Sequence, residues 1–457
     1  MKRSKGILFC PIAIVMLVLF SFSSSIYAQS AENNDSQKRQ LIIDSVFGFD
    51  SDTIVADDQN LIIDYEIPGY LADMINSADL GAAKGGGIGA LVISGSNHID
   101  YDSFEVSFQE EAFKIITEGA QESRIHQLEL RSPLVGSVRF IDRDDIARLG
   151  AGYFTLKIQK LDHKILNQEA KAVINDRPVL VVDLKVDNQE LPALEGGMLF
   201  SIPYDASEED FSQLTLYQID ASGGLKQIRN CRYINDIYRY GGDENQYYLQ
   251  ALIKEAGSYA IGYDKVALND VKGWYEPYVN FVAARGIMNT NDDGAFMPHQ
   301  SITRGDLAYF LANMSDETIE NYTNHEFLDV SDDHPYEKSI SWAYTTGVIK
   351  GYQDGTFRPD QVITRQELAV MLNRYADIIG KTYLPRKFVP QDFKDDREIA
   401  SYAKESVYYL QQAGVINGRS NNHFEPRENV TRAECAKMIA TVIDGIMECK
   451  TKFVPLD

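Results

Sequence analysis

The residues best suited to chemistry in this sequence are three arginines, each preceded by Thr and followed two positions later by Asp or Glu. The copies are Thr303-Arg304-Gly305-Asp306, Thr364-Arg365-Gln366-Glu367 and Thr431-Arg432-Ala433-Glu434. Thr followed three residues later by an acidic residue is a capping box, which marks the start of a helix. Each Arg then lies in the first helical turn, at the positive end of the helix dipole. Because free N–H groups at a helix start favour an anion and a guanidinium fits a carboxylate, the motifs predict three anion-binding corners.

A second interpretation of the three arginines is structural. The chain has 67 Asp and Glu against 44 Lys and Arg, a formal net charge of -23. In so acidic a chain, each Arg can instead pair with a nearby Asp or Glu and tie its surroundings together. If the arginines bind anions, replacing Arg304 and Arg365 by Ala abolishes binding with little loss of helicity. If they are structural ties, the same replacement unfolds the region.

The spacing around the arginines shows an internal repeat. A Gly precedes each Arg by 18 residues, a Phe follows that Gly by ten residues, and a Pro comes two residues later. Apolar residues at positions +3, +6, +7 and +10 after each Arg form one helical stripe. Each repeat therefore predicts an apolar helix, an Asp-Gly turn and a capped helix. Since one such pair cannot bury its apolar face alone, three should pack around a shared core.

Residues 266–320, 326–380 and 390–445 resemble S-layer homology domains, the cell-wall anchoring modules of bacterial surface proteins. The likeness rests on the openings Leu268-Asn269-Asp270, Phe327-Leu328-Asp329 and Phe393-Lys394-Asp395, on a helix ending in Gly-Ile or Gly-Val, and on the Asp-Gly-x-Phe-x-Pro turn before the Thr-Arg box.

The resemblance implies an all-α, three-lobed module whose grooves hold an acidic, often pyruvylated, sugar of a secondary cell-wall polymer. The residues implied to bind the polymer are Arg304, Arg365, Arg432, Trp274, Gly294 and Gly355. The helix caps of these corners are Thr303, Asp306, Thr364, Glu367, Thr431 and Glu434.

The three repeats depart from the family pattern at different places. Gly305 stands where a helix former is expected, which lowers the local helix propensity. Asn421-Asn422 replaces Asp-Gly in the third repeat, although Asn can also adopt the left-handed turn. Trp274 has a near counterpart in Tyr336, whereas Tyr402 falls out of place. The grooves are therefore expected to differ, with that of the third repeat the weakest.

The N-terminus has the pattern of a secretory signal peptide, with basic residues, an apolar run over residues 6–22, and cleavage after Ala28. An uncleaved anchor helix is the alternative, since the run approaches spanning length. Residues 29–40 are polar and predict a disordered leader. Without residues 1–28 the chain has 41 basic and 67 acidic residues, a charge of -26, which argues against nucleic acid as a partner.

Residues 41–265 predict a β-rich, sandwich-like region with some α+β character, as one or two domains, ahead of the helical module and a tail at 446–457. Two hairpin turns are expected at 221–224 and 255–257. Strands are predicted at residues 41–43, 61–65, 91–93, 104–108, 128–130, 154–158, 179–186, 198–202, 214–219, 225–233, 247–253 and 258–263, and helices at 110–117 and 144–149. Arg177-Pro178-Val179 and Ile202-Pro203-Tyr204 resemble the β-rich segments that precede anchoring repeats in large surface proteins, a likeness that implies no chemistry.

Other motifs with chemical potential are weak. Residues 85–89 (Gly-Gly-Gly-Ile-Gly) lack the Gly-Lys-Ser/Thr ending of a phosphate loop and predict a flexible loop. The acids at 141–145 could supply the paired carboxylates of a glycosidase or mark a helix start. Metal-ligand spacings are incomplete, so neither a metal nor a cofactor is expected. Cys435 occupies an apolar helix position and should be buried, and Cys231 and Cys449 form no Cys-x-x-Cys pair.

These features predict a secreted, non-catalytic surface or S-layer-type protein of a Gram-positive bacterium, held on the wall by non-covalent binding of its repeats to the acidic polymer. Further copies in a surface lattice are a second expected partner, whereas nucleic acid and, after signal cleavage, the membrane are not. The alternative is an extracellular carbohydrate hydrolase that uses the same anchor, with its active site in residues 41–265.

Overall fold

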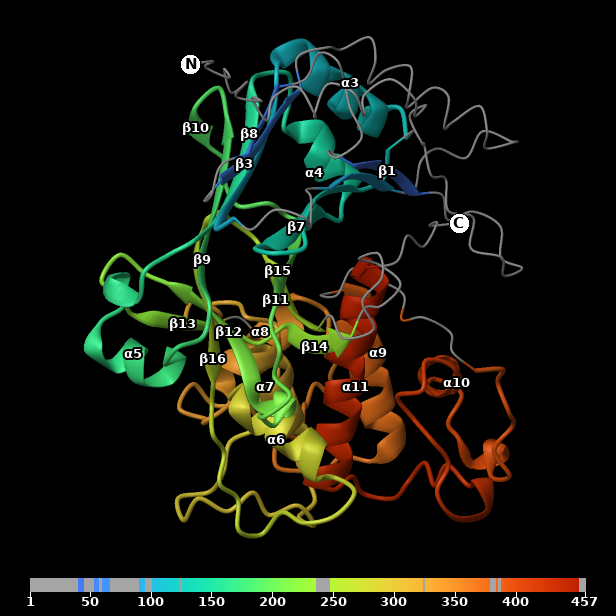
Figure 1. Ribbon diagram of the computed structural model, residues 1–457. Coiled ribbons are helices and arrows are strands. Elements are labelled where there is room, and N and C mark those ends of the chain that lie inside the picture. Colours follow the sequence, from blue (N-terminus) through green and yellow to red (C-terminus); the bar gives the residue numbers. More distant parts are fainter. Residues whose placement is uncertain are drawn as a thin grey trace, which may run out of the picture.

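The computed structural model describes residues 40–44, 53–56, 60–65, 90–94, 101–123, 125–235, 247–323, 325–378, 384 and 388–451. In this part of the chain, two β-sheets with a few helices precede a region of paired helices (Figure 1). The predicted signal peptide, the leader apart from its last residue, and the glycine-rich segment 85–89 lie outside the described residues.

The first sheet has seven strands, in the order β1-β4-β6-β7-β11-β15-β14. Its parallel part is β1, β4 and β6, and the other neighbours are antiparallel. The bounds are β1 Gln40–Asp44, β4 Ala90–Ser94, β6 Leu128–Ser132, β7 Gly136–Phe140, β11 Met198–Pro203, β15 Tyr247–Ile253 and β14 Cys231–Asn235.

The second sheet has nine strands, eight in the order β13-β12-β16-β9-β8-β5-β3-β2, with the short β10 paired to β9. Among its described strands, β3 and β5 pair in parallel and the other pairs are antiparallel. The bounds are β13 Leu225–Ile228, β12 Leu214–Ile219, β16 Gly257–Tyr263, β9 Val179–Val186, β8 Phe154–Lys160, β5 Ser103–Phe108, β3 Asn60–Tyr65, β2 Thr53–Ala56 and β10 Gln189–Glu190.

The two sheets share one hydrophobic core. Strand β8 shows why: Phe154, Leu156 and Ile158 alternate with polar residues and are fully buried. Phe154 stacks on Phe113 of helix α3 (Glu110–Gln121), with ring centroids 4.3 Å apart. The other helices of this region are α4 Arg143–Arg148, α5 Gln168–Ile174 and the 3-10 turns η1 His163–Ile165 and η2 Phe211–Gln213. The predicted β-rich character is confirmed.

Two predicted connections in this region are wrong. Residues 225–233, expected as one strand, form β13 in the second sheet and the start of β14 in the first. Residues 255–257, expected as a hairpin turn, connect β15 of the first sheet to β16 of the second, so the chain changes sheets there. By contrast, residues 221–224 do join the antiparallel strands β12 and β13. Strands β2, β7 and β10 and helix α5 were not predicted.

The described residues of the C-terminal region form three helix pairs and two 3-10 turns. The first helices are α6 Glu276–Ala284, α8 Glu337–Thr345 and α10 Lys404–Gln412, and the second helices are α7 Arg304–Met314, α9 Arg365–Ile378 and α11 Arg432–Thr451, with η3 Asp396–Glu398 and η4 Ser420–Asn422. Buried residues from all six helices belong to one hydrophobic cluster. The predicted helical repeats around a shared core are therefore confirmed.

The helical region is docked onto the β-rich region through buried polar contacts. Arg285, at the end of α6, is fully buried and donates to the carbonyl oxygens of Ser212 and Leu214, both at 2.8 Å. On β14, Arg232 donates to the Asp444 carboxylate of α11 at 2.9 Å, and Figure 1 shows these two elements side by side. A buried cation held by backbone carbonyls fixes the relative position of the two regions.

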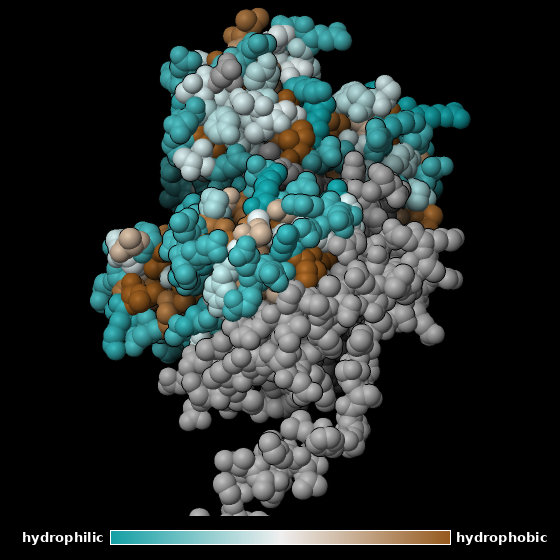
Figure 2. All heavy atoms as spheres, turned by 90° about the horizontal axis from the view of Figure 1, so that it is seen from above, coloured by the Kyte–Doolittle hydropathy of each residue, from teal (hydrophilic) through white to brown (hydrophobic). Residues whose placement is uncertain are grey.

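The coloured part of the face in Figure 2 is mostly hydrophilic, with hydrophobic side chains in separate groups among the hydrophilic ones. This fits the acidic composition of the chain. Among the helices of the described residues, none combines the length and the apolar character needed to cross a membrane.

Candidate functional site

The starts of α7, α9 and α11 meet, and their backbones are joined in a closed ring. The N–H of Ile302 donates to the carbonyl of Val430 at 3.0 Å, and the N–H of Ile363 donates to Ile302, also at 3.0 Å. The N–H of Val430 closes the ring on the carbonyl of Ile363 at 3.3 Å. The same backbone hydrogen bond therefore joins the first repeat to the second, the second to the third, and the third to the first.

All three helix starts have capping boxes. Thr303 Oγ1 accepts from the N–H of Asp306 at 3.0 Å, and the Asp306 carboxylate accepts from the N–H of Thr303 at 2.8 Å. Thr364 with Glu367, and Thr431 with Glu434, form the same reciprocal bonds at 3.0 to 3.4 Å.

The first free N–H groups of these helices have partners in the next repeat. The N–H of Arg304 donates to Gln361 at 2.9 Å, and that of Gly305 donates to Pro359 at 2.8 Å. The expectation that free helix N–H groups attract an anion is therefore wrong, because neighbouring carbonyls occupy them. Any anion at these sites must be held by side chains.

Each box arginine is buried against the phenylalanine of the following repeat. Arg304, Arg365 and Arg432 are 5%, 3% and 8% exposed. Their Nε atoms donate to the carbonyl oxygens of Phe357, Phe424 and Phe296 at 2.8, 2.8 and 2.6 Å, and the guanidinium carbons lie 4.7, 5.2 and 4.6 Å from the centres of those phenylalanine rings. These contacts match the structural interpretation of the arginines. Burial lowers the pKa of Arg365 and of Arg432.

Each corner combines residues from different repeats, and we name each corner after its arginine. The Arg304 corner contains Arg304, Phe357, Glu367 and Tyr402; the Arg365 corner contains Arg365, Phe424 and Glu434; the Arg432 corner contains Arg432, Phe296, Asp306 and Tyr336. The arginine of one repeat thus meets the phenylalanine and the box acid of the next repeat.

Three aromatic residues, Trp274, Tyr336 and Tyr402, lie at the starts of the first helices. Trp274 and Tyr402 each directly precede the residue that caps their helix, and Tyr336 is itself the capping residue of α8. The expectation that Tyr402 is out of place is therefore wrong. Trp274 is 58% exposed, and Lys437 Nζ lies 5.8 Å from its ring centre. Burial raises the pKa of Tyr402, with Glu367 raising it further and Arg304 lowering it.

The turn glycines Gly294 and Gly355 adopt φ values of +76° and +80°, which favour glycine. In the third repeat, Asn421 and Asn422 take φ of +58° and +57°, so asparagine does replace the Asp-Gly turn in the left-handed region.

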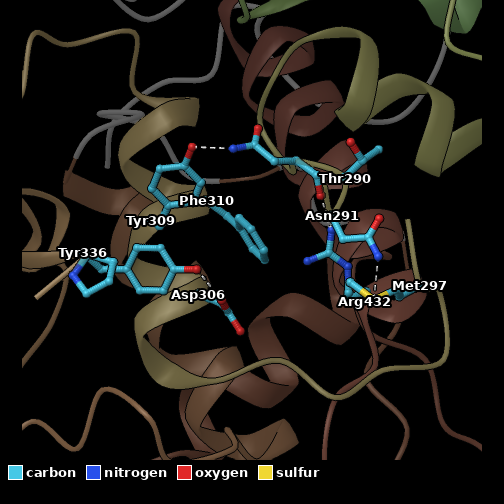
Figure 3. Close-up of a pocket in the computed structure, with 10 residues that line it drawn as sticks. Thr290, Asn291, Met297, Asp306, Tyr309, Phe310, Tyr336 and Arg432 are labelled. Atoms are coloured by element: carbon cyan, nitrogen blue, oxygen red, sulfur yellow. Dashed lines mark hydrogen bonds between the residues drawn. The ribbon is translucent and has the colours of Figure 1, made fainter. Parts of the chain in front are cut away.

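A cavity of about 370 Å³ opens in the Arg432 corner (Figure 3). Its lining comes from all three repeats: Asn289, Thr290, Asn291, Met297, Asp306, Tyr309, Phe310, Pro335, Tyr336 and Arg432. Figure 3 shows the Arg432 guanidinium facing the cavity from one side, with Tyr309 and Tyr336 on the other. The volume is in the range of small-molecule sites.

The cavity includes one predicted binding residue, Arg432, which belongs to the repeat expected to be weakest. Trp274, Gly294 and Gly355 do not line it. Tyr309, Asn289 and Asn291 were not predicted, because nothing in their own repeat indicates that the third repeat's arginine lies beside them. The only available signal was the repeat spacing, which places Asn289 three residues after Gly286.

The carboxylates at 141–145 are engaged in local structure. Asp142 accepts from the N–H of Asp144 at 2.8 Å and caps α4, and Asp145 accepts from the N–H of Gly196 at 2.8 Å. Burial raises the pKa of Asp145. This is the helix-start arrangement that was the alternative to a catalytic pair.

The described part of the chain has no cluster of metal-ligating residues, and Cys231 and Cys435 in it are free cysteines. No group of three His, Cys, Asp or Glu residues there could hold a metal ion. Cys231 and Cys435 are buried free thiols, and Cys435 packs in the helical core, as predicted. Burial strongly raises the pKa of the Cys435 thiol.

A scan against family models matches the S-layer homology domain at residues 267–308, 326–369 and 392–436. Each stretch covers the first helix of a pair, the Thr-Arg box and the start of the second helix. The chain carries three S-layer homology domains.

Similar S-layer homology (SLH) stretches occur in curated bacterial proteins of different kinds. The chain is 31% identical over 191 residues to an amylopullulanase of Thermoanaerobacterium thermosulfurigenes, covering 41% of this chain and 10% of that protein. It is 31% identical over 185 residues to an exoglucanase of Acetivibrio thermocellus, covering 40% and 16%. It is 29% identical over 167 residues to an S-layer protein of Bacillus thuringiensis subsp. finitimus, covering 36% and 20%. The match thus spans a fifth or less of each relative's length.

Proposed function

We propose that this chain is a secreted, non-catalytic surface protein of a Gram-positive bacterium, held on the cell wall by its SLH domains through non-covalent binding of an acidic, pyruvylated secondary polymer. The observation that carries the proposal is the Arg432 corner. There a buried guanidinium faces a cavity of about 370 Å³ with two tyrosines opposite, a setting in which an arginine can pair with a carboxylate and aromatic rings can contact a sugar.

Binding to the wall is tested by co-sedimentation of the mature full-length chain with sacculi, before and after acid extraction of the non-peptidoglycan polymer. The full chain is used because Arg285 buries its charge against the β-rich region, and separating the regions would expose that contact. We expect binding that is lost on extraction. Binding that survives extraction would point to peptidoglycan itself, and no binding would make the SLH domains a protein-contact module.

The absence of catalysis is part of this proposal. Two of the similar proteins bear the names of carbohydrate hydrolases, so an anchored hydrolase with its site in residues 41–265 is the competing function. Against it, Asp142 and Asp145 are occupied by helix capping and by the Gly196 N–H. Incubation of the purified protein with wall glycans should release no new reducing ends, and release of sugar would reverse the choice.

A further inference from the structure

We propose that the Arg432 corner alone receives the ligand's carboxylate, and that the short side chain of Asp306 is what leaves this corner available. This inference rests on the proposed function. It assigns carboxylate binding to one of the three corners, although the three corners occupy matching positions in the repeats.

The other two corners supply their own carboxylate. Glu367 Oε1 lies 3.4 Å from Arg304 Nη1, and Glu434 Oε1 lies 3.5 Å from Arg365 Nη1. Both acids have additional donors: Tyr352 O–H bonds Glu367 at 2.6 Å, and Arg419 Nη2 bonds Glu434 at 2.6 Å. An incoming anion would have to displace an ion pair that the fold has already formed, which is costly for charges buried to this degree.

The first box, whose acid faces Arg432, has Asp where the other two boxes have Glu, and its carboxylate has different partners. Asp306 Oδ2 accepts from the N–H of Thr303 at 2.8 Å, as in a capping box, while Oδ1 accepts from Tyr336 O–H at 2.8 Å. Asp is one methylene shorter than Glu, and Tyr336 holds its second oxygen. Among the described residues, Arg432 consequently forms no ion pair with any carboxylate.

The Arg432 guanidinium has donor capacity left for a ligand. Its Nε and Nη2 donate to the carbonyl oxygens of Phe296 and Asn289, and Nη1 has no hydrogen-bond partner within the described residues. Burial lowers the pKa of Arg432 more than the nearby Asp306 and Asp270 raise it, and no carboxylate of the described residues lies within ion-pair distance of the guanidinium. A guanidinium that is 8% exposed and only partly compensated gains most from a carboxylate brought in by a ligand. The side chains of Asn289, Thr290 and Asn291 line the same cavity and supply polar groups for sugar hydroxyls.

The test is co-sedimentation of the mature full-length chain and three variants with polymer-bearing sacculi. Asp306→Glu gives the first box the acid of the other two, so it keeps the cap and supplies Arg432 with an internal partner. Asn289→Trp fills the cavity from its exposed rim. Lys350→Trp places the same bulk at the same repeat position in the Arg304 corner, where Lys350 is also exposed, and is the matched control.

We expect both Asp306→Glu and Asn289→Trp to weaken binding by about tenfold or more. In Asp306→Glu the cation is already paired and gives little affinity, and in Asn289→Trp the cavity is filled. Lys350→Trp should bind as the wild type does, and melting curves should show all three variants folded. Wild-type affinity in Asp306→Glu, or an equal loss in Lys350→Trp, would overturn the assignment to one corner. Failure of the wild type to bind would instead refute wall binding as a whole, and the inference with it.

Discussion

Arg432 of the third repeat bonds Phe296 of the first, with its Nε 2.6 Å from the Phe296 carbonyl oxygen and its guanidinium carbon 4.6 Å from the ring centre. The two residues are 136 positions apart in the chain. The contact repeats the geometry of Arg304 on Phe357 and Arg365 on Phe424. The three SLH domains therefore form a ring in which the same Arg–Phe contact joins each domain to the next. We call each such contact a junction, and each arginine is a structural part of one junction.

Removing a junction arginine should destabilise the module. In Arg365→Ala, the buried carbonyl of Phe424 and the carbonyl of Asn417 lose their donor, and Glu434 loses a counter-ion. We expect a loss of about 3 kcal/mol in the free energy of unfolding, measured by urea denaturation. This reverses the expectation of little structural effect. Arg358→Ala, at an exposed arginine, should change stability by less than about 0.5 kcal/mol; equal effects would show that burial of Arg365 is unimportant.

Gly305 should resist replacement by alanine even though alanine favours helix. A Cβ at this position would lie 2.9 Å from Tyr336 Cδ2 and 3.1 Å from the Pro359 carbonyl oxygen. We expect Gly305→Ala to cost about 1 kcal/mol or more despite a propensity gain of similar size. The reverse change at the matching position, Ala433→Gly, should also cost about 1 kcal/mol. Thermal melts of the two variants that shift in opposite directions would mean that propensity alone governs this position.

Shortening the acid of a closed corner should open it. In Glu367→Asp, the carboxylate no longer reaches Arg304, which it now approaches to 3.4 Å. If a paired acid is what closes a corner, this variant gains a second binding site, which binding isotherms with soluble polymer fragments would detect as about a doubled capacity per chain. Glu276→Gln, an exposed change on α6, serves as the control and should leave the capacity unchanged. An unaltered capacity in Glu367→Asp would show that the corner is closed by something other than the ion pair.

Acid should weaken the module through the box glutamates. Burial opposes ionisation of Glu367 and Glu434, but hydrogen bonds and nearby arginines outweigh it and lower each pKa below 4.5. A carboxyl with a lower pKa in the folded state stabilises the fold while ionised. The contribution of each ionised glutamate to the free energy of unfolding is complete above pH 4.5 and is lost as the pH falls through the folded-state pKa.

The pH effect is measured as the drop in the urea midpoint between about pH 6 and about pH 3. The drop should be smaller in the double variant Glu367→Gln, Glu434→Gln than in the wild type, because Gln does not titrate. Equal drops in the two proteins would place the acid sensitivity elsewhere in this acidic chain.

The local part of this fold could be predicted from the sequence, because its determinants are close together in the chain. The capping box of Thr303 and Asp306 and the stripe after each Arg depend on residues a few positions apart. Most β-strands were predicted for the same reason. Sheet membership was not, since the connection at residues 255–257 gives no sign that β15 and β16 belong to different sheets.

The candidate site was predicted only in part, because its composition depends on contacts between repeats. The arginines could be identified from their spacing, but their phenylalanine partners lie 53 to 136 positions away. The acid of the first box differs from the other two by one methylene and by its hydrogen bond from Tyr336 of the next repeat. Neither difference can be assessed from one repeat alone. A repeat pattern shows that positions are equivalent, and it is at the exceptions, such as Asp306, that the corners differ.

Helix α11 begins at Arg432 in the corner and carries Asp444, which holds Arg232 of β14. The two contacts are 12 residues apart on this helix, or about 18 Å at the helical rise. If the Arg432 corner binds the wall as proposed, part of a mechanical load on the β-rich region would pass to that corner along the axis of this helix. The helix would then act as a stiff strut, which orients the β-rich region relative to the wall as well as retaining it.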